Sequence, residues 1–274
     1  MKWLKLYFKL LDRFFPNLAA KKVHQLMSKP RVRKLRAFEE EILDRSEKEV
    51  MLFKSFEIQT YRWGRASDPA VLVVHGWEGQ AGNFGGLVDP LLEKGYRVIA
   101  YDAPSHGHSS KGKMNMFIIA DLVEILAKKY QPKAIISHSF GSVISAMLLK
   151  ENPSIAVQNW IMVTTPHKYL HYLENMSHFL ELSEGTFNKL IKLVEQELDT
   201  DIHDMDMAKY CAQLENVASA TIIHSKADKI IPIKSARVVH EGFPQSELVE
   251  LEKLGHYSIL WSDQLKAKVG AVLA

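Results

Sequence analysis

The chain has 274 residues, of which 47% are hydrophobic, so it is long enough to bury the core of one large domain. Its single cysteine, Cys211, excludes an intramolecular disulfide framework and favours a reducing, cytoplasmic location. No apolar run reaches the roughly 18 residues of a membrane-spanning helix, so we expect none.

The formal net charge of +3 conceals an asymmetry between the first 36 residues and the rest of the chain. Residues 1–36 contain 11 Lys and Arg and one acidic residue, Asp12, which gives a net charge of +10. The remaining residues carry 24 Lys and Arg against 31 Asp and Glu, a net charge of −7. We therefore expect a basic helical arm over residues 1–49, followed by an acidic globular domain over residues 50–274.

Residues 1–15 have the pattern of an amphipathic helix, which Pro16 would end. On a helical wheel the charged residues share one arc of roughly 100°: Lys2, Lys5, Lys9, Asp12 and Arg13. Lysines interrupt the apolar residues and no small-residue cleavage site follows, so we do not expect a secretory signal.

Three partners would suit the apolar face of residues 1–16: an anionic membrane surface, the body of the protein and a second protomer. The first would make the protein peripheral on the inner face of a membrane. The charge of the arm would also suit nucleic acid, but nine apolar residues on one face argue against such a partner.

From residue 56 onward, strand and helix patterns alternate. Phe56–Trp63 alternates apolar and polar residues, as in an antiparallel strand that enters a sheet. Six further strands are expected at Val71–Val74, Val98–Tyr101, Ala134–Ser137, Trp160–Thr164, Thr221–His224 and Glu247–Leu251. Helices are expected near Phe84–Glu93, Phe117–Tyr130, Gly141–Lys150 and Tyr257–Val272. The alternation predicts an α/β fold with a mostly parallel central sheet and flanking helices.

One segment breaks the alternation. Residues 166–217 contain no buried-strand pattern, only the helical patterns Tyr169–Leu182 and Phe187–Leu198. We expect a helical cap inserted after the sixth strand of the sheet.

The most informative motif is S-H-S-F-G, residues 137–141, between an expected strand and an expected helix. A serine at the apex of such a turn, Ser139, would expose its hydroxyl above the sheet, and the next N–H would point at a developing oxyanion. Upstream, a strand ends in His75–Gly76–Trp77, and another strand runs into D-A-P-S-H-G-H-S, residues 102–109. Downstream, Asp228 follows a strand and His256 follows the next one.

With these motifs in this order, residues 50–274 resemble the α/β-hydrolase superfamily, in particular its serine esterase and lipase-like branch. The resemblance implies that Ser139 is the nucleophile, His256 the base and Asp228 the acid that orients it. It also implies an oxyanion hole formed by the backbone N–H groups of Trp77 and Phe140, and no cofactor.

Two residues depart from the pattern of the family. Ser137 stands in place of the first glycine of G-x-S-x-G, and Ser105 in place of the first glycine of D-x-x-G-x-G-x-S. Both departures bear on turn geometry, because serine tolerates a positive φ less well than glycine does. We expect Asp102, at the start of the second motif, to be a structural acceptor and not a catalyst.

The expected function is cleavage of an ester or related acyl bond through an acyl-enzyme on Ser139. A C–C bond hydrolase with the same three residues and a non-catalytic binding module are the alternatives. The sequence does not define the substrate, since the apolar residues of the cap could equally be its own packing core. Histidines cluster at two places without a clear carboxylate or cysteine partner at a zinc spacing, so no metal is expected: His106 and His108, and His167, His171 and His178.

Overall fold

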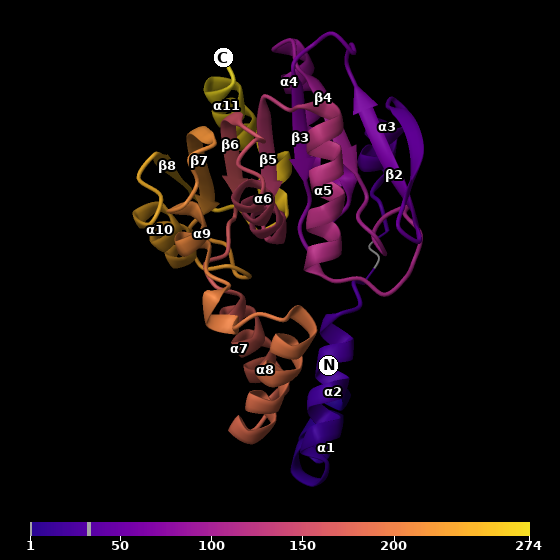
Figure 1. Cartoon of the computed structure of the whole chain (residues 1–274), viewed down its shortest axis with the longest axis vertical. Helices are drawn as coiled ribbons and strands as arrows, with labels where there is room; N and C mark the ends of the chain where they lie inside the picture. The colour runs from indigo at the N-terminus through magenta and orange to yellow at the C-terminus, as the bar shows by residue number, and fades with distance from the viewer. Residues whose placement is uncertain (1, 32–33) are drawn as a thin grey trace. The chain divides into compact units, whose positions relative to one another are not determined.

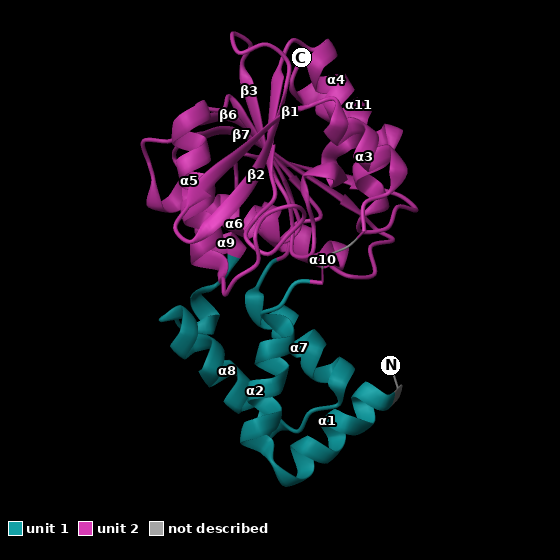
Figure 2. Ribbon diagram, turned by 90° about the vertical axis from the view of Figure 1, so that its right-hand side faces the viewer, with its two compact units in different colours: residues 1–30, 167–206 teal, residues 31–166, 207–274 magenta. Residues whose placement is uncertain are grey.

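The computed structural model describes residues 2–31 and 34–274 and divides them into two compact units. Unit 1 combines residues 1–30 with 167–206, and unit 2 combines residues 31–166 with 207–274 (Figure 2). Three residues of the expected arm, Met1, Val32 and Arg33, lie outside the described residues.

Unit 2 is built on an eight-stranded sheet with the strand order β1-β2-β4-β3-β5-β6-β7-β8 (Figure 1). The β1–β2 and β2–β4 pairs are antiparallel and the other pairs are parallel. The strands are β1 (Glu47–Phe53), β2 (Phe56–Trp63), β3 (Ala70–Val74), β4 (Arg97–Tyr101), β5 (Ala134–His138), β6 (Val157–Val163), β7 (Val217–Ser225) and β8 (Ser246–Leu251). The predicted α/β fold with a mostly parallel sheet is confirmed.

Helices cover both faces of this sheet. One layer holds α5 (Met116–Tyr130), α6 (Phe140–Glu151) and α9 (Met207–Cys211), and the other holds α3 (Ala37–Asp44), α4 (Gly85–Glu93) and α11 (Asp263–Val272) (Figure 2). The remaining helices of the unit are η1 (Ala81–Phe84), α10 (Ile233–Glu241) and η3 (Ser258–Trp261). Every residue of β3 and β5 is buried, which explains why these strands are continuous apolar runs.

The register of the central strands brings their carboxyl ends together. Val74 of β3 pairs with Ser137 of β5, and His138 of β5 pairs with Val163 of β6. The turn from β5 into α6 is therefore next to the ends of both neighbouring strands. At the start of α6 a Cβ on Gly141 would lie 2.2 Å from the backbone oxygen of Val74, so only glycine fits there.

Two expected boundaries differ from the structure. Residues 47–49 were expected in the arm and no strand was expected over residues 50–53, but residues 47–53 form β1, an edge strand whose alternating exposed residues give no buried-strand pattern. The compact units divide at residue 30 instead of 49, because α3 also belongs to unit 2, where Leu43 joins the core. The expected C-terminal helix is interrupted at Ser262, whose side chain caps α11 by accepting a hydrogen bond from the Leu265 N–H.

Unit 1 consists of helices from two distant parts of the chain. They are α1 (Lys2–Phe14), α2 (Pro16–Met27), α7 (Tyr169–Leu180), α8 (Glu184–Leu198) and η2 (Ile202–Asp204). Segment 167–206 leaves the sheet between β6 and β7, as expected of an insertion after the sixth strand. The N-terminal helices pack on it, α1 against α7 and α2 against α8.

Polar contacts join the two halves of unit 1. The Asp12 carboxylate accepts hydrogen bonds from the Ser183 N–H (2.9 Å) and hydroxyl (2.8 Å) at the start of α8. Lys5 lies 3.0 Å from Glu181, and His24 lies 2.8 Å from Glu197. Over the described residues, no helix is both long and apolar enough to cross a membrane.

The packing of α6 on β3 yields a stability prediction. Gly141→Ala should lower the free energy of unfolding by about 3 kcal/mol, because the new methyl group has no space beside the Val74 carbonyl. Gly270→Ala in α11 is the matched control, since a Cβ there meets only the Lys94 side chain at 3.8 Å. The control should raise stability by about 0.5–1 kcal/mol, as alanine does in a helix interior. Urea unfolding measures both, and a Gly141 variant as stable as wild type would contradict the prediction.

Candidate active site

Ser139 occupies a strained turn between β5 and α6. Its φ of 54° and ψ of −123° lie outside the regions that residues with a side chain ordinarily adopt. The Ser139 N–H donates to the Val163 oxygen (2.9 Å), and the Ser139 carbonyl accepts from the Ser142 N–H (2.9 Å). Strand β6 and the first turn of α6 thus hold the backbone in a conformation that it would not adopt alone.

Small residues lie near Ser139 at points where the surrounding backbone is close. A Cβ on Gly76 would lie 2.9 Å from the His138 oxygen and 3.0 Å from the Ser139 Cβ. Ser137 is part of regular strand β5 and has no positive φ, so its serine is accommodated without strain. Its buried hydroxyl lies 3.0 Å from the Ser142 hydroxyl and accepts a hydrogen bond from the Trp160 indole N–H (2.9 Å).

The structure brings Ser139, His256 and Asp228 together. The His256 Nε2 lies 3.1 Å from the Ser139 Oγ, and the His256 Nδ1 lies 2.7 Å from the Asp228 Oδ2. A carboxylate only accepts hydrogen bonds, so Nδ1 carries a proton. In the neutral imidazole Nε2 is then the acceptor that faces the Ser139 hydroxyl.

Asp228 is buried at the turn that follows β7. Burial by itself would raise its pKa, but hydrogen bonds from His256 and from the Ile231 and Ile230 N–H groups outweigh it, and the pKa lies below the usual value. The two amides lie 3.0 and 2.8 Å from Oδ1, so the other oxygen is left for His256. The carboxylate is therefore ionised at neutral pH.

Two buried histidines support this arrangement, and the sequence did not reveal them. The His138 Nε2 donates to the backbone oxygen of His256 (2.8 Å), and the two rings lie 4.8 Å apart. Burial, followed by the nearby His256, lowers the pKa of His138 to about 3, so it stays neutral. The His224 Nε2 donates to the Ile231 oxygen (2.9 Å) in the turn that carries Asp228. Only the position of His138 beside Ser139 in the motif could have indicated its role.

Trp77 lies in the loop after β3, and Phe140 is the first residue of α6, next to Ser139. Neither backbone N–H group donates a hydrogen bond within the part of the chain that the structure describes. The Trp77 and Phe140 rings pack edge to face, with centroids 5.9 Å apart. The next residue, Glu78, has a φ of 57° and accepts hydrogen bonds from the Arg31 guanidinium (2.7 and 3.1 Å). The loop is therefore held in place while two amides remain available.

Asp102 has a structural position. It accepts hydrogen bonds from the Tyr61 hydroxyl (2.9 Å), the Ala81 N–H (2.8 Å) and the His108 N–H (2.8 Å), and none from His256. Burial would raise its pKa, but hydrogen bonds from His108, followed by the one from the Ala81 N–H, keep the pKa below its usual value. The carboxylate thereby joins strand β2, helix η1 and the loop after β4.

Ser105, in the loop after β4, does adopt the left-handed conformation that glycine favours. Its φ is 65°, and its hydroxyl donates to the Gly112 oxygen (2.9 Å) and accepts from the Gly112 N–H (3.0 Å). These bonds tie the turn to the chain seven residues later. They give a reason why serine is tolerated at this position.

No group of three His, Cys, Asp or Glu side chains is placed to hold a metal ion among residues 2–31 and 34–274. In unit 1 the His167 Nε2 lies 3.2 Å from the Asp206 Oδ1, and the His171 ring packs against His167. In unit 2 His106 is buried, and burial lowers its pKa to about 3. Its Nε2 accepts a hydrogen bond from the Glu78 N–H (3.3 Å). These histidines act as polar links in loops and helices.

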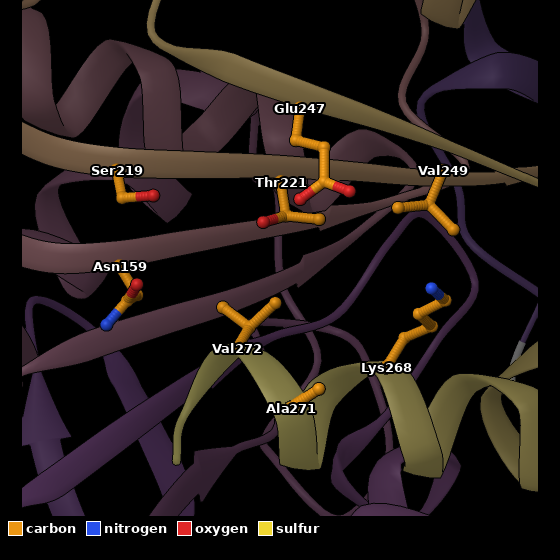
Figure 3. Close-up of a pocket in the computed structure, with 8 residues that line it drawn as sticks. All are labelled: Asn159, Ser219, Thr221, Glu247, Val249, Lys268, Ala271 and Val272. Carbon is orange, nitrogen blue, oxygen red and sulfur yellow. The ribbon is translucent and has the colours of Figure 1, made fainter.

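A cavity of about 300 Å³ lies at a different place in unit 2 (Figure 3). Its lining comes from β6, β7, β8 and α11: Asn159, Ser219, Thr221, Glu247, Val249, Lys268, Ala271 and Val272. Asn159 and Ser219 lie near the starts of their strands, whereas Ser139 follows the carboxyl end of β5. The cavity is therefore separate from the Ser139 site.

Comparison with known proteins agrees with this geometry. The family model described as "alpha/beta hydrolase fold" matches residues 69–220, more than half of the chain, and the chain belongs to this family. A human serine hydrolase-like protein is 33% identical over 110 residues, which are 38% of this chain and 53% of the human one. The chain thus matches only about half of that relative's length.

Solved structures share the fold at lower identity. An esterase from Pyrococcus furiosus superposes with a TM-score of 0.64 at 17% identity, over 90% of this chain and 96% of the esterase. A putative lipase from Acinetobacter baumannii gives a TM-score of 0.66 at 17% identity, over 88% of this chain and 97% of the other. At this identity the likeness establishes the fold alone.

The burial of His138 yields a prediction for the pH dependence of stability. Its folded pKa of about 3 lies below the unfolded value of about 6.5, so only the unfolded chain binds a proton between these values. The contribution of neutral His138 to the free energy of unfolding is therefore present above pH 6.5 and is lost as the pH falls. When the pH is lowered from 7 to 5, the protonation of this residue in the unfolded chain should lower the free energy of unfolding by about 2 kcal/mol. Most carboxylates titrate below that window.

The measurement compares wild type with His138→Gln, whose amide can still donate to the His256 carbonyl. Urea unfolding at pH 7 and at pH 5 gives the loss of stability for each protein. The loss should be smaller by about 2 kcal/mol in the variant, because glutamine does not titrate. Equal losses in both proteins would show that His138 does not stay neutral in the fold.

Proposed function

We propose that the protein is a serine hydrolase that cleaves an ester or related acyl bond through an acyl-enzyme on Ser139. The observation that carries the proposal is the hydrogen-bonded series from Ser139 through His256 to Asp228, at the end of a strained turn. A hydroxyl is a weak nucleophile at neutral pH and needs a base within hydrogen-bond reach. His256 has that position, and Asp228 fixes its tautomer.

In the proposed reaction the Ser139 Oγ attacks the acyl carbon while His256 Nε2 takes the hydroxyl proton. Asp228 stabilises the imidazolium that forms, and the Trp77 and Phe140 N–H groups donate to the oxyanion of the tetrahedral intermediate. His256 then gives its proton to the leaving oxygen, and the C–O bond breaks. His256 next takes a proton from the water that attacks the acyl carbon, and it gives that proton to the Ser139 Oγ as the bond from Oγ to the acyl carbon breaks. These steps require no cofactor.

The names of similar proteins support this class of reaction. The human relative is a serine hydrolase-like protein, and the superposed structures include an esterase and a putative lipase. A C–C bond hydrolase would use the same three residues and remains the alternative enzyme. A non-catalytic binding module would not need Ser139, His256 and Asp228 in hydrogen-bonding register, and we therefore favour an enzyme.

Removal of the Ser139 hydroxyl tests the catalytic assignment. Ser139→Ala should lower kcat on p-nitrophenyl esters by at least about 10⁴-fold, because the acyl-enzyme cannot form. Ser145→Ala is the matched control: this α6 serine is buried, but its hydroxyl donates within its own helix, to the Gly141 oxygen (2.8 Å). A panel of acyl-chain lengths gives the preferred substrate in the same assay. Equal rates for wild type and Ser139→Ala would rule out the proposed nucleophile.

Other results of the same assay would test whether the bond that the protein cleaves is an ester. Wild-type protein that turns over none of the panel, but cleaves a dienone-type C–C substrate in a Ser139-dependent way, would replace esterase with the alternative enzyme. Binding of ligands without any turnover would favour the binding module.

The two buried aspartates provide a second test. Asp228→Asn should lower kcat on the order of 10⁴-fold, because an amide can leave His256 in the wrong tautomer. Asp102→Asn should leave kcat within about tenfold and instead lower stability, by about 1–3 kcal/mol for a disturbed buried hydrogen-bond network. Steady-state kinetics at a temperature where both variants remain folded separate the roles. A large loss for Asp102→Asn with a small one for Asp228→Asn would reverse the assignment.

A further inference from the structure

Helix α1 has two apolar faces, and unit 1 uses only one of them. Phe8 and Leu11 are buried where α1 packs against its neighbours in this unit. Five other large apolar side chains of α1 are between 48% and 83% exposed, and we refer to them as the exposed strip: Trp3, Leu6, Tyr7, Leu10 and Phe14. Internal packing of the unit therefore accounts for only part of the apolar surface of α1.

The exposed strip is continuous along the helix. Leu6 and Tyr7 are adjacent and the other intervals are three and four residues, so on a helical wheel the five residues fall within an arc of roughly 100°. The surface continues past the end of α1, because Phe15 and Leu18 are also exposed. Single exposed apolar residues are common on soluble proteins, but a run of this length marks an interaction surface.

Cationic side chains border the exposed strip on one side. Lys9 and Arg13 are exposed and form no ion pair with any residue in the described ranges. Lys5 pairs with Glu181, while the one acidic residue of α1, Asp12, is directed to Ser183 of the same unit. The strip is thus flanked by positive charge that forms no close ion pair among the described residues, and the one carboxylate of α1 is already hydrogen-bonded to Ser183.

We propose that the exposed strip docks the protein on an anionic membrane surface. Trp, Tyr, Phe and Leu are the side chains that occupy the boundary between head groups and acyl chains, and lysine and arginine bind anionic head groups. Helix α1 would lie in the plane of the surface, with Lys9 and Arg13 among the lipid phosphates. Docking of this kind would place a hydrolase where substrates that partition into lipid are concentrated.

A second copy of the chain is a poorer partner for the same strip. In a two-fold symmetric contact each residue of the patch meets the patch of the other copy. Lys9 and Arg13 of both copies would then share one interface without an acidic side chain of α1 to pair with them. Like charges brought together in this way oppose association, whereas an anionic surface attracts them.

Cosedimentation of the full chain with lipid vesicles tests the proposal. Wild type should bind vesicles that contain phosphatidylglycerol at low ionic strength and bind phosphatidylcholine vesicles more weakly. The triple variant Leu6→Gln, Leu10→Gln, Phe14→Gln should bind about a hundredfold more weakly, because three half-exposed apolar side chains no longer enter the interface. The matched control, Val50→Gln with Leu52→Gln, changes two exposed apolar residues of β1 in unit 2 and should bind as wild type does.

The charge contribution is measured by a second variant. Lys9→Gln with Arg13→Gln should weaken binding to the anionic vesicles by roughly thirtyfold at low salt. The difference from wild type should shrink as ionic strength rises, because salt screens the attraction. Circular dichroism and thermal unfolding check that each variant is folded, and all these substitutions are at exposed positions.

Three results would overturn the proposal. One is that wild type fails to bind anionic vesicles at low ionic strength, and another is that wild type and the triple variant bind equally well. The third such result is a concentration-dependent dimer that forms in wild type and is lost in the triple variant alone. Turnover of a soluble p-nitrophenyl ester is measured in parallel and should be the same in wild type and all these variants. Loss of vesicle binding with normal turnover would refute docking alone, and vesicle binding without turnover would refute the hydrolase alone.

Discussion

The turn at Ser139 is the constraint on which the rest of unit 2 depends. Its φ of 54° is unfavourable for serine, and it persists because β5 is buried between β3 and β6 and because α6 begins at once. Gly76 and Gly141 allow the backbones on either side to approach closely. The strain exposes a hydroxyl at the carboxyl edge of the sheet, where the loops after β7 and β8 deliver Asp228 and His256.

Neutral histidines are a second theme of the site. His138, His75 and His224 are buried, and burial lowers the pKa of each. His75 accepts a hydrogen bond at Nε2 from the Ala103 N–H (3.0 Å) in the loop after β4, and His138 donates to the His256 oxygen in the loop after β8. His224 instead donates to the Ile231 oxygen in the loop that follows its own strand. An imidazole can donate and accept at opposite ends of a rigid ring, so it links loops that a hydroxyl could not reach. The carboxylates of Asp102 and Asp228 also hold loops in place, because each accepts hydrogen bonds from backbone N–H groups.

The sequence predicted those parts of the molecule that local patterns specify. Buried strands such as β3 are apolar throughout and were therefore recognisable. Ser139, Asp228 and His256 each follow such an expected strand, so the sequence also predicted that they lie at strand ends. Strand β1 was missed because it is an edge strand with exposed charged residues and shows no buried pattern. The hydrogen bond by which His138 supports His256 was missed because the two residues are 118 positions apart in the sequence. The apolar face of a helix also does not indicate which surface it packs against, so the sequence could not predict the packing of α2 on α8.

Unit 1 has a consequence for the order in which the chain can fold. Its two segments, residues 1–30 and 167–206, are separated by most of the sheet. During synthesis from the N-terminus, α1 and α2 emerge long before α7 and α8 exist, so the apolar side of α2, with Val23 and Met27, stays uncovered meanwhile. Contacts between segments so distant in sequence form slowly, because a long loop must close first. The N-terminal helices of unit 1 are thus made well before the segment on which they pack, and they are among the last elements to be completed.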